Sequence, residues 1–253
     1  MAEKKDRLNE TRVNNNGEEM RIIRYGNCED IDVQFEDGTI VEHKQYCHFK
    51  VGSIRNPMTP SLYGVGFMGI GDYKGTDENG KQTKCHKTWS GMYTRCYDPK
   101  YHEKYPTYKN CKVCEEWWNH QEFAKWYNEN YYEVGNERME LDKDILCKGN
   151  KVYSPDTCIF VPNSINGLFA KRNKRRGDCP IGVTKHGDKF MARLNKGNGK
   201  IMYLGIYLTV EEAFLAYKIA KEEYIKEVAE EYKGKIPYRL YEALMNYEVE
   251  ITD

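Results

Sequence analysis

The sequence predicts an α+β protein in which three small modules follow one another along the chain. Short stretches with alternating apolar and polar residues, typical of strands, occur near both ends of the 253 residues. Stretches with apolar residues three or four positions apart, typical of helices, occur in the middle and near the C-terminus. Glycine-containing turn dipeptides separate the strand-like stretches. This order of strands and helices does not have the regular βαβ alternation of a parallel α/β fold.

Residues 1–57 are predicted to form a small β module, either barrel-like or a twisted sheet. Apolar and polar residues alternate, as in strands, over residues 20–27, 30–35 and 39–49. In the second of these strands, one face carries Ile31, Val33 and Phe35. Asp37-Gly38 predicts a hairpin turn, because glycine adopts the positive φ that such turns need. With its pattern Y-x-N-x-x-D-I-x-V-x-F-x-D-G, the segment 8–57 resembles the small Src-homology-three-like modules that begin many phage proteins. That resemblance implies no chemistry by itself.

Residues 63–170 are predicted to form a central module that contains a ββα unit. The glycine-rich stretch 64–75 lacks the Lys-Ser/Thr end of a phosphate-binding loop, so a glycine-rich turn is the better interpretation. Helices are predicted over 87–97 and 119–131 from the spacing of their aromatic residues. Strands are predicted over 139–146 and 158–161, with a turn at 148–150, and a helix is predicted to follow from Asn163.

Residues 180–235 are predicted to form a three-stranded sheet packed on one helix. The strands lie within 180–186, 188–196 and 200–208, and Thr209 is a natural N-cap for a helix over 210–232. In the second strand, Ala192 and Leu194 should face the helix, while Arg193 and Asn195 face outward. The tail, residues 236–253, has apolar residues at helical spacing and should pack against that helix.

Charge is distributed unevenly along a chain of zero net charge. The stretch from Lys171 to Leu204 contains ten Lys or Arg residues and only two Asp, and its first part, 171–179, reads as a basic linker. A basic sheet surface favours nucleic-acid binding, although surface Lys and Arg can also simply keep a sheet soluble. Arg193 could present a fork to guanine and Asn195 could do so to adenine. The candidate DNA-binding residues are Lys171, Arg172, Lys174, Arg175, Arg176, Lys185, His186, Lys189, Arg193, Asn195, Lys196 and Lys200.

The C-terminal module resembles the Apetala-two (ethylene-response-factor) type of DNA-binding domain. The residues that carry the resemblance are Gly182, Val183, Ala192, Leu194, Tyr203, Leu204, Gly205, Tyr207, Thr209, Glu211, Glu212, Ala213, Ala216, Tyr217 and Ala220. The resemblance implies a three-stranded sheet that enters the major groove of double-stranded DNA. Thr184 and Tyr203 stand where the plant members have Arg and Trp, so the plant target sequence is not carried over.

The central module resembles an HNH (ββα-metal) endonuclease. The resemblance rests on W-x-x-M-x-x-R-C-Y at 89–97, V-C-x-E-W at 113–117 and L-D-K-D to I-N at 141–166. Together with the C-terminal module, it implies a phage or mobile-element endonuclease of homing type that hydrolyses phosphodiesters with one Mg²⁺ or Mn²⁺. The implied catalytic residues are Asp142, Lys143, Asp144 and Asn166, and the implied metal ligands are Asp142, Asp144 and Asn166.

Two positions of that active site depart from the family. Lys143 stands where the general-base His belongs, and Thr157 stands where the Asn that orients it belongs. A lysine is protonated at neutral pH and is a poor base, although it can bind a phosphate. Strand alternation predicts that Asp142 and Asp144 point the same way and hold a metal that activates water without a His.

Three functions therefore stay open. The chain is a metal-dependent endonuclease, a catalytically silent DNA-binding regulator, or a phage protein that binds a protein of a host defence complex.

The remaining features argue against other cofactors and against a membrane. The nine cysteines and the absence of a secretory signal favour reduced thiols, and the C-x-x-C at 111–114 has no partner ligands at zinc-site spacing, so zinc is not expected. Histidines 43, 48, 102, 120 and 186 read as surface or hydrogen-bonded residues. No apolar stretch is long enough to span a membrane. A soluble protein of the bacterial cytoplasm is expected, and the sequence does not indicate an oligomeric state.

Overall fold

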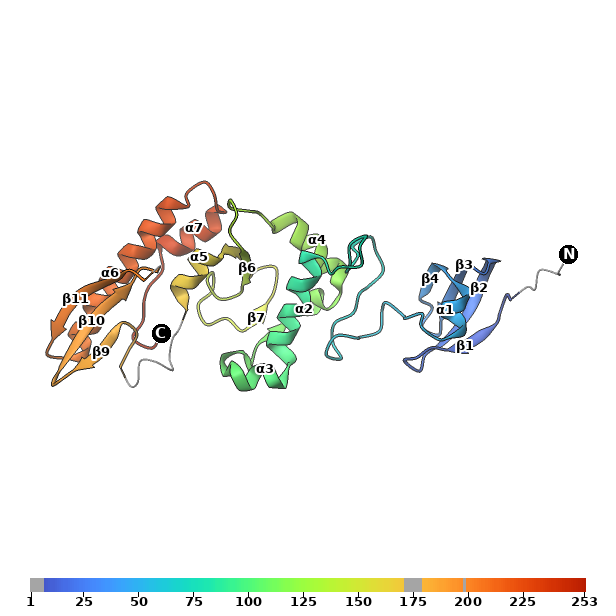
Figure 1. Cartoon of the computed structure of the whole chain (residues 1–253), viewed down its shortest axis with the longest axis horizontal. Helices are drawn as coiled ribbons and strands as arrows, with labels where there is room; N and C mark the ends of the chain where they lie inside the picture. Colours follow the sequence, from blue (N-terminus) through green and yellow to red (C-terminus); the bar gives the residue numbers. More distant parts are fainter. Residues whose placement is uncertain (1–6, 171–178, 198) are drawn as a thin grey trace. The chain divides into compact units, whose positions relative to one another are not determined.

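The computed structural model describes residues 7–170, 179–197 and 199–253 (Figure 1). The chain divides into two compact units, Met1–Asn128 and Glu129–Asp253. Both helices and sheets are present, as the α+β prediction requires. Within the described residues, no helix combines the length and the apolar character needed to cross a bilayer.

The first unit begins with a four-stranded antiparallel sheet whose strands follow chain order. These are β1 (Thr11–Val13), β2 (Glu19–Asn27), β3 (Asp30–Phe35) and β4 (Ile40–Lys44), followed by the short α1 (Tyr46–Lys50). Ile22, Ile31, Val33 and Phe49 are fully buried in its core. Among the described residues the sheet does not close, so the barrel-like expectation is corrected to an open meander whose edge strands are β1 and β4.

The regular structure in the rest of the first unit is mainly helical. It contains α2 (Lys84–Tyr97), α3 (Pro99–Lys104), α4 (His120–Asn130), the 3₁₀ turns η1 (Pro106–Tyr108) and η2 (Glu115–Trp118), and the short β5 (Lys112–Val113). The helix predicted over 87–97 begins one turn earlier, because the Thr83 hydroxyl accepts the His86 N–H at 3.1 Å. Trp89 and Tyr93 both donate to the carbonyl of Trp117, at 2.8 and 3.2 Å. The aromatic residues of α2 are therefore core residues, as their spacing predicts.

The glycine-rich stretch packs closely against the helices instead of forming a phosphate loop. A Cβ atom on Gly66 would lie 2.8 Å from the Tyr93 ring, and one on Gly69 would lie 2.0 Å from Oδ1 of Asn119. One on Gly71 would lie 2.4 Å from Oε1 of Gln121. Contacts this short require residues without a side chain, so close packing accounts for the glycines.

The second unit contains the predicted ββα arrangement. Strands β6 (Met139–Asp142) and β8 (Ile159–Pro162) pair antiparallel, and the single-turn α5 (Asn163–Asn166) and η3 (Gly167–Phe169) follow, with β7 (Val152–Tyr153) before β8. The first strand is shorter than the predicted 139–146. Asp142 Oδ1 accepts the backbone N–H groups of Asp144 and Ile145, at 2.8 and 2.7 Å, and this turns the chain out of the strand.

The C-terminal sheet and two helices complete the second unit. The sheet consists of β9 (Val183–His186), β10 (Lys189–Asn195) and β11 (Ile201–Tyr207), in the spatial order β11-β10-β9. Helix α6 (Val210–Glu231) begins with a capping box between Thr209 and Glu212, and α7 (Tyr238–Met245) follows it.

Helix α6 packs against two different cores. Its N-terminal half lies beside the sheet (Figure 1). There Phe214 and Tyr217 are buried in the same cluster as Ala192. Its C-terminal half buries Ile225 and Val228 together with α7 and the ββα residues. That second cluster comprises Ile145, Ile159, Val161, Ile165, Ile225, Val228, Ala229, Ile236, Leu240 and Leu244. The ββα arrangement and the C-terminal sheet, predicted as parts of separate modules, therefore share one helix.

Candidate functional site

One face of the C-terminal sheet is packed on α6, and the other is not. Residues that pair directly across antiparallel strands lie on the same face. The pairs that include β10 are Lys189 with His186, Met191 with Thr184 and Ile206, Arg193 with Tyr203, and Asn195 with Ile201. Ala192 and Leu194, on the opposite face, are buried against α6 as predicted. We call the nine residues Thr184, His186, Lys189, Met191, Arg193, Asn195, Ile201, Tyr203 and Ile206 the outer face.

A β-bulge determines which residues of β11 reach the outer face. The register shifts between Ala192 and Arg193, so that one residue of β11 has no direct partner. Tyr203 and Ile206 are three positions apart and would lie on opposite faces of a regular strand. The extra residue places both on the outer face, and Gly205, at φ +136°, adopts a backbone conformation that favours glycine.

The outer face has a basic and apolar composition. His186, Lys189 and Arg193 are exposed, and none of the nine residues carries a carboxylate. Tyr203 and Ile206 are 60% and 42% exposed, which is high for residues of their size. Basic side chains can pair with the charged groups of a polyanion, and the exposed apolar side chains can contact flat or methyl-bearing groups that lie between those charges.

Several predicted DNA-binding residues lie elsewhere. Lys185 pairs with Phe190, which packs toward α6, so Lys185 is on the helix side of the sheet. The Lys196 ammonium lies 3.0 Å from the Glu227 carboxylate and 4.6 Å from the centre of the Tyr224 ring, both on α6. Lys200 is exposed just before β11. Lys171, Arg172, Lys174, Arg175 and Arg176 lie outside the described residues.

Asn195 is on the outer face, but its amide is already engaged. Its Oδ1 accepts the backbone N–H of Gly197 at 2.9 Å in the turn that follows β10. Bidentate recognition of adenine needs both the oxygen and the nitrogen of the amide. The expectation of a bidentate Asn195–adenine contact is therefore not supported by this arrangement.

The ββα residues predicted as catalytic are only partly brought together. Asp144 lies in the bend after β6, so the expectation that strand alternation aligns it with Asp142 was wrong. Burial raises the pKa of Asp142 to about 6, and the nearby Asp144 carboxylate adds to the rise. The buried Lys143 donates to Asp144 and to the carbonyl of Asn150, each at 3.0 Å. Its ammonium is thus held inside the fold.

Asn166, the predicted helix ligand, contacts a residue that the sequence reasoning missed. Its side-chain amide donates to the carboxylate of Glu140, which also lies 3.1 Å from the Arg138 guanidinium. Glu140 is two positions before Asp142 on β6, so the two carboxylates share a face of the strand. That spacing is the signal that could have identified Glu140. Thr157 donates to the Val152 carbonyl at 2.9 Å and so stabilises a turn.

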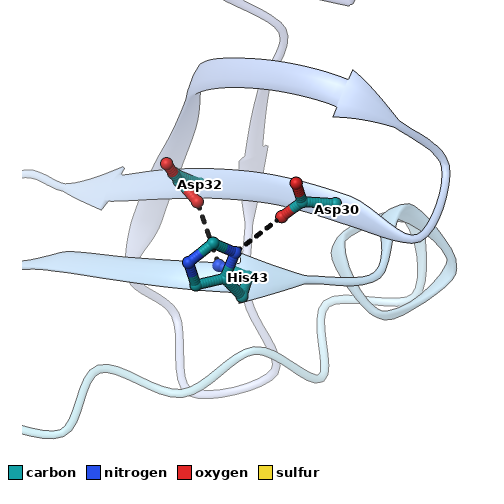
Figure 2. Close-up of side chains that lie close together, drawn as sticks. All are labelled: Asp30, Asp32 and His43. Carbon is teal, nitrogen blue, oxygen red and sulfur yellow. Dashed lines mark hydrogen bonds and ion pairs between the residues drawn. The ribbon is translucent and has the colours of Figure 1, made fainter.

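A cluster of potential metal ligands lies instead on the N-terminal sheet. Within the residues that the structure describes, Asp30, Asp32 and His43 are the one group of three His, Cys, Asp or Glu side chains whose ligand atoms lie within 4.8 Å of one another (Figure 2). His43 Nδ1 lies 2.8 Å from Asp30, and its backbone N–H donates to Asp32 at 2.9 Å. The Arg24 guanidinium bonds both carboxylates and lowers the pKa of each. The cluster is an ion-pair network, because the two carboxylates that a metal would use already pair with the Arg24 guanidinium.

Two histidines of the first unit, one half-buried and one buried, lie beside each other. The rings of His86 on α2 and His120 on α4 have centroids 5.1 Å apart, and His120 is 1% exposed. Neither ring nitrogen of His120 has a hydrogen-bond partner among the described residues, so the expectation that His120 is a surface or hydrogen-bonded residue was wrong. Burial lowers the pKa of His120 to about 4, and repulsion from His86 adds to the effect.

Comparisons of the chain with protein families, with curated proteins and with solved structures find no match in any of the three.

Proposed function

We propose that this protein binds double-stranded DNA through the outer face. The observation that carries the proposal is the composition of that face, which combines Lys189, Arg193 and His186 with exposed apolar groups and no carboxylate. Basic side chains supply the phosphate contacts that dominate the affinity of DNA-binding proteins. Exposed apolar groups of this size are otherwise unfavourable in water.

The dimensions of the face are consistent with a groove of B-DNA. Lys189 and Arg193 are four residues apart on β10, which corresponds to about 14 Å along a strand. The major groove is about 12 Å wide. With β10 laid across the groove, each of the two cations reaches the phosphates of one wall, and Met191 lies over the base edges between them. Helix α6, packed on the opposite face, holds the strands in place.

The salt dependence of binding tests this proposal. The full chain is titrated into a fluorescein-labelled random 30-base-pair duplex at several KCl concentrations, and binding is followed by anisotropy. Loss of one phosphate contact should reduce the slope of log K against log[KCl] by about 0.9. Lys189→Ala and Arg193→Ala should each show this reduction. Lys226→Ala removes the same charge from the exposed surface of α6 and should leave the slope unchanged.

Two results would contradict the proposal. The first is the absence of binding by the wild-type chain at low salt. The second is a slope that changes as little in Lys189→Ala and Arg193→Ala as in Lys226→Ala, because binding would then not depend on this face.

A second candidate function is metal-dependent DNA cleavage at the ββα arrangement. Glu140 and Asp142 share a face of β6, and the Asn166 side chain contacts Glu140. Carboxylate and amide oxygens are the ligands that Mg²⁺ prefers, and an ion bound there would take the place of the Asn166–Glu140 hydrogen bond. Lys143 is no candidate for the base, since its buried ammonium is held by Asp144 and Asn150. The ion itself would supply the nucleophile by lowering the pKa of bound water.

Plasmid nicking with Mg²⁺ or Mn²⁺ tests the second candidate. Asp142→Asn is the appropriate variant, because the amide oxygen keeps the acceptor that Asp144 and Ile145 use. We expect nicking by the wild type, its loss in Asp142→Asn, and DNA binding in both. Binding without nicking by either protein would leave a DNA-binding regulator.

A further inference from the structure

We propose that the central row of the outer face recognises thymine methyl groups, so that the DNA sites this protein prefers contain thymines at their centre. The inference rests on the proposed DNA binding and specifies which chemical group of the bases the outer face contacts. The row consists of Thr184, Met191 and Ile206, which pair directly across β9, β10 and β11. It lies between the row of Lys189 and His186 and the row of Arg193 and Tyr203.

The side chains of this row present hydrocarbon groups. None of them presents an accessible polar group that could hydrogen-bond to the edge of a base. Ile206 is 42% exposed, and Met191 is half-buried beside it. The hydroxyl oxygen of Thr184 is buried, so it is not available to a base. The cations lie one row away on either side, where they can contact the phosphates.

Thymine matches such a row better than the other bases do. It alone presents a methyl group in the major groove, at its C5 position. In the major groove cytosine presents an amino donor, guanine two acceptors, and adenine one donor and one acceptor, whereas thymine presents its methyl group beside a single acceptor. A polar group that loses water without gaining a partner is unfavourable, and only thymine offsets that loss with an apolar contact. Three strands about 4.8 Å apart span about 10 Å, which corresponds to about three base-pair steps of about 3.4 Å.

Replacement of thymine by uracil tests the inference, because it removes only the 5-methyl group. Duplexes that bind the full chain are first selected from a random 30-base-pair pool made with thymidine triphosphate. The selected duplexes are then copied with deoxyuridine triphosphate, and both forms are titrated at the same salt concentration. Since one buried methyl group corresponds to about a fourfold change in affinity, the uracil form should bind about fourfold more weakly for each thymine contacted.

Variants show whether the row is responsible. Ile206→Ala should reduce the ratio of the two dissociation constants toward one. Leu215→Ala removes an exposed apolar side chain from α6 and should keep the wild-type ratio. Equal binding of the thymine and uracil forms by the wild type would overturn the thymine inference and leave DNA binding intact. Failure to bind either form would overturn the proposed function and this inference together.

Discussion

Tyr203 on β11 lies directly opposite Arg193 on β10, on the face of the sheet that α6 does not cover. An exposed aromatic ring and a guanidinium group are thereby paired across two strands. The pairing depends on the bulge, since the register shifts immediately before Arg193. Without the shift, Tyr203 and Ile206 would lie on opposite faces, and the outer face would lose one of these two exposed apolar groups.

Gly205→Ala is expected to destabilise the second unit and to weaken DNA binding. The φ of +136° at Gly205 strains any residue with a side chain, and an added Cβ would lie 3.1 Å from the Tyr207 hydroxyl. We expect a loss of about 1–3 kcal/mol in the free energy of unfolding. Urea unfolding measures the loss. Gly199→Ala is the control for ordinary left-handed strain, because Gly199 has a φ of +75° and an added Cβ would have no atom within 4 Å. It should lower the free energy of unfolding by less than Gly205→Ala does.

Gly69→Ala should cost markedly more stability than Gly80→Ala. Both glycines have a φ near +70°, so both substitutions carry the same backbone strain. Only at Gly69 would the new Cβ meet another residue, 2.0 Å from Oδ1 of Asn119. We expect Gly80→Ala to lower the free energy of unfolding by about 1 kcal/mol, and Gly69→Ala to lower it by about 2 kcal/mol more than that. Thermal unfolding of the two variants decides, and equal losses would contradict close packing as the reason for the glycine.

His120 should make the first unit sensitive to acid. Its pKa is about 4 in the folded chain and about 6.5 when unfolded, so below pH 6.5 the unfolded state binds a proton that the folded state does not. Stability is therefore lost as the pH falls from about 6.5 to about 4, by at most about 3 kcal/mol. His120→Phe removes this loss. Urea unfolding at pH 7.5 and pH 5 should show a smaller difference in the variant, and an identical difference would refute the assignment.

Asp142 should have the opposite pH dependence. Its pKa is about 6 in the folded chain against 3.8 in the unfolded one, so between these values the folded state binds the extra proton. Stability therefore falls as the pH rises from about 4 to about 6. Asp142→Asn keeps the acceptor oxygen without the charge and should be more stable than the wild type at pH 7, by about 1–3 kcal/mol. The advantage should disappear below pH 4, and a variant less stable at pH 7 would contradict this assignment.

Several elements could be predicted because their signals are local. Thr209 and Glu212 form the capping box of α6 from residues three positions apart, and alternation in β10 correctly places Ala192 and Leu194 against the helix. The predicted packing of the tail on the same helix is also confirmed by the burial of Leu240 with Ile225. In each case the residues that decide the structure are neighbours in the chain, or share a face through a regular period.

Other features depended on side-chain hydrogen bonds and on strand pairing, which the apolar pattern of the sequence does not report. The Asp142 side chain ends β6 early, so Asp144 follows the strand instead of belonging to it, and the Asn166 side chain bonds Glu140. Side chains alternate between the two faces only as long as the strand is regular. A turn capped by a side chain, or a bulge, ends that alternation without changing the apolar pattern from which the strand is predicted. The sequence by itself therefore determined most strands of the two larger sheets, helices α2, α4 and α6, and which strand is basic. It did not determine α1 (Tyr46–Lys50), which lies where a strand over 39–49 was predicted to continue. The tertiary structure alone decided which side chains share the outer face and the ββα site, because register and side-chain pairing depend on residues far apart in the chain.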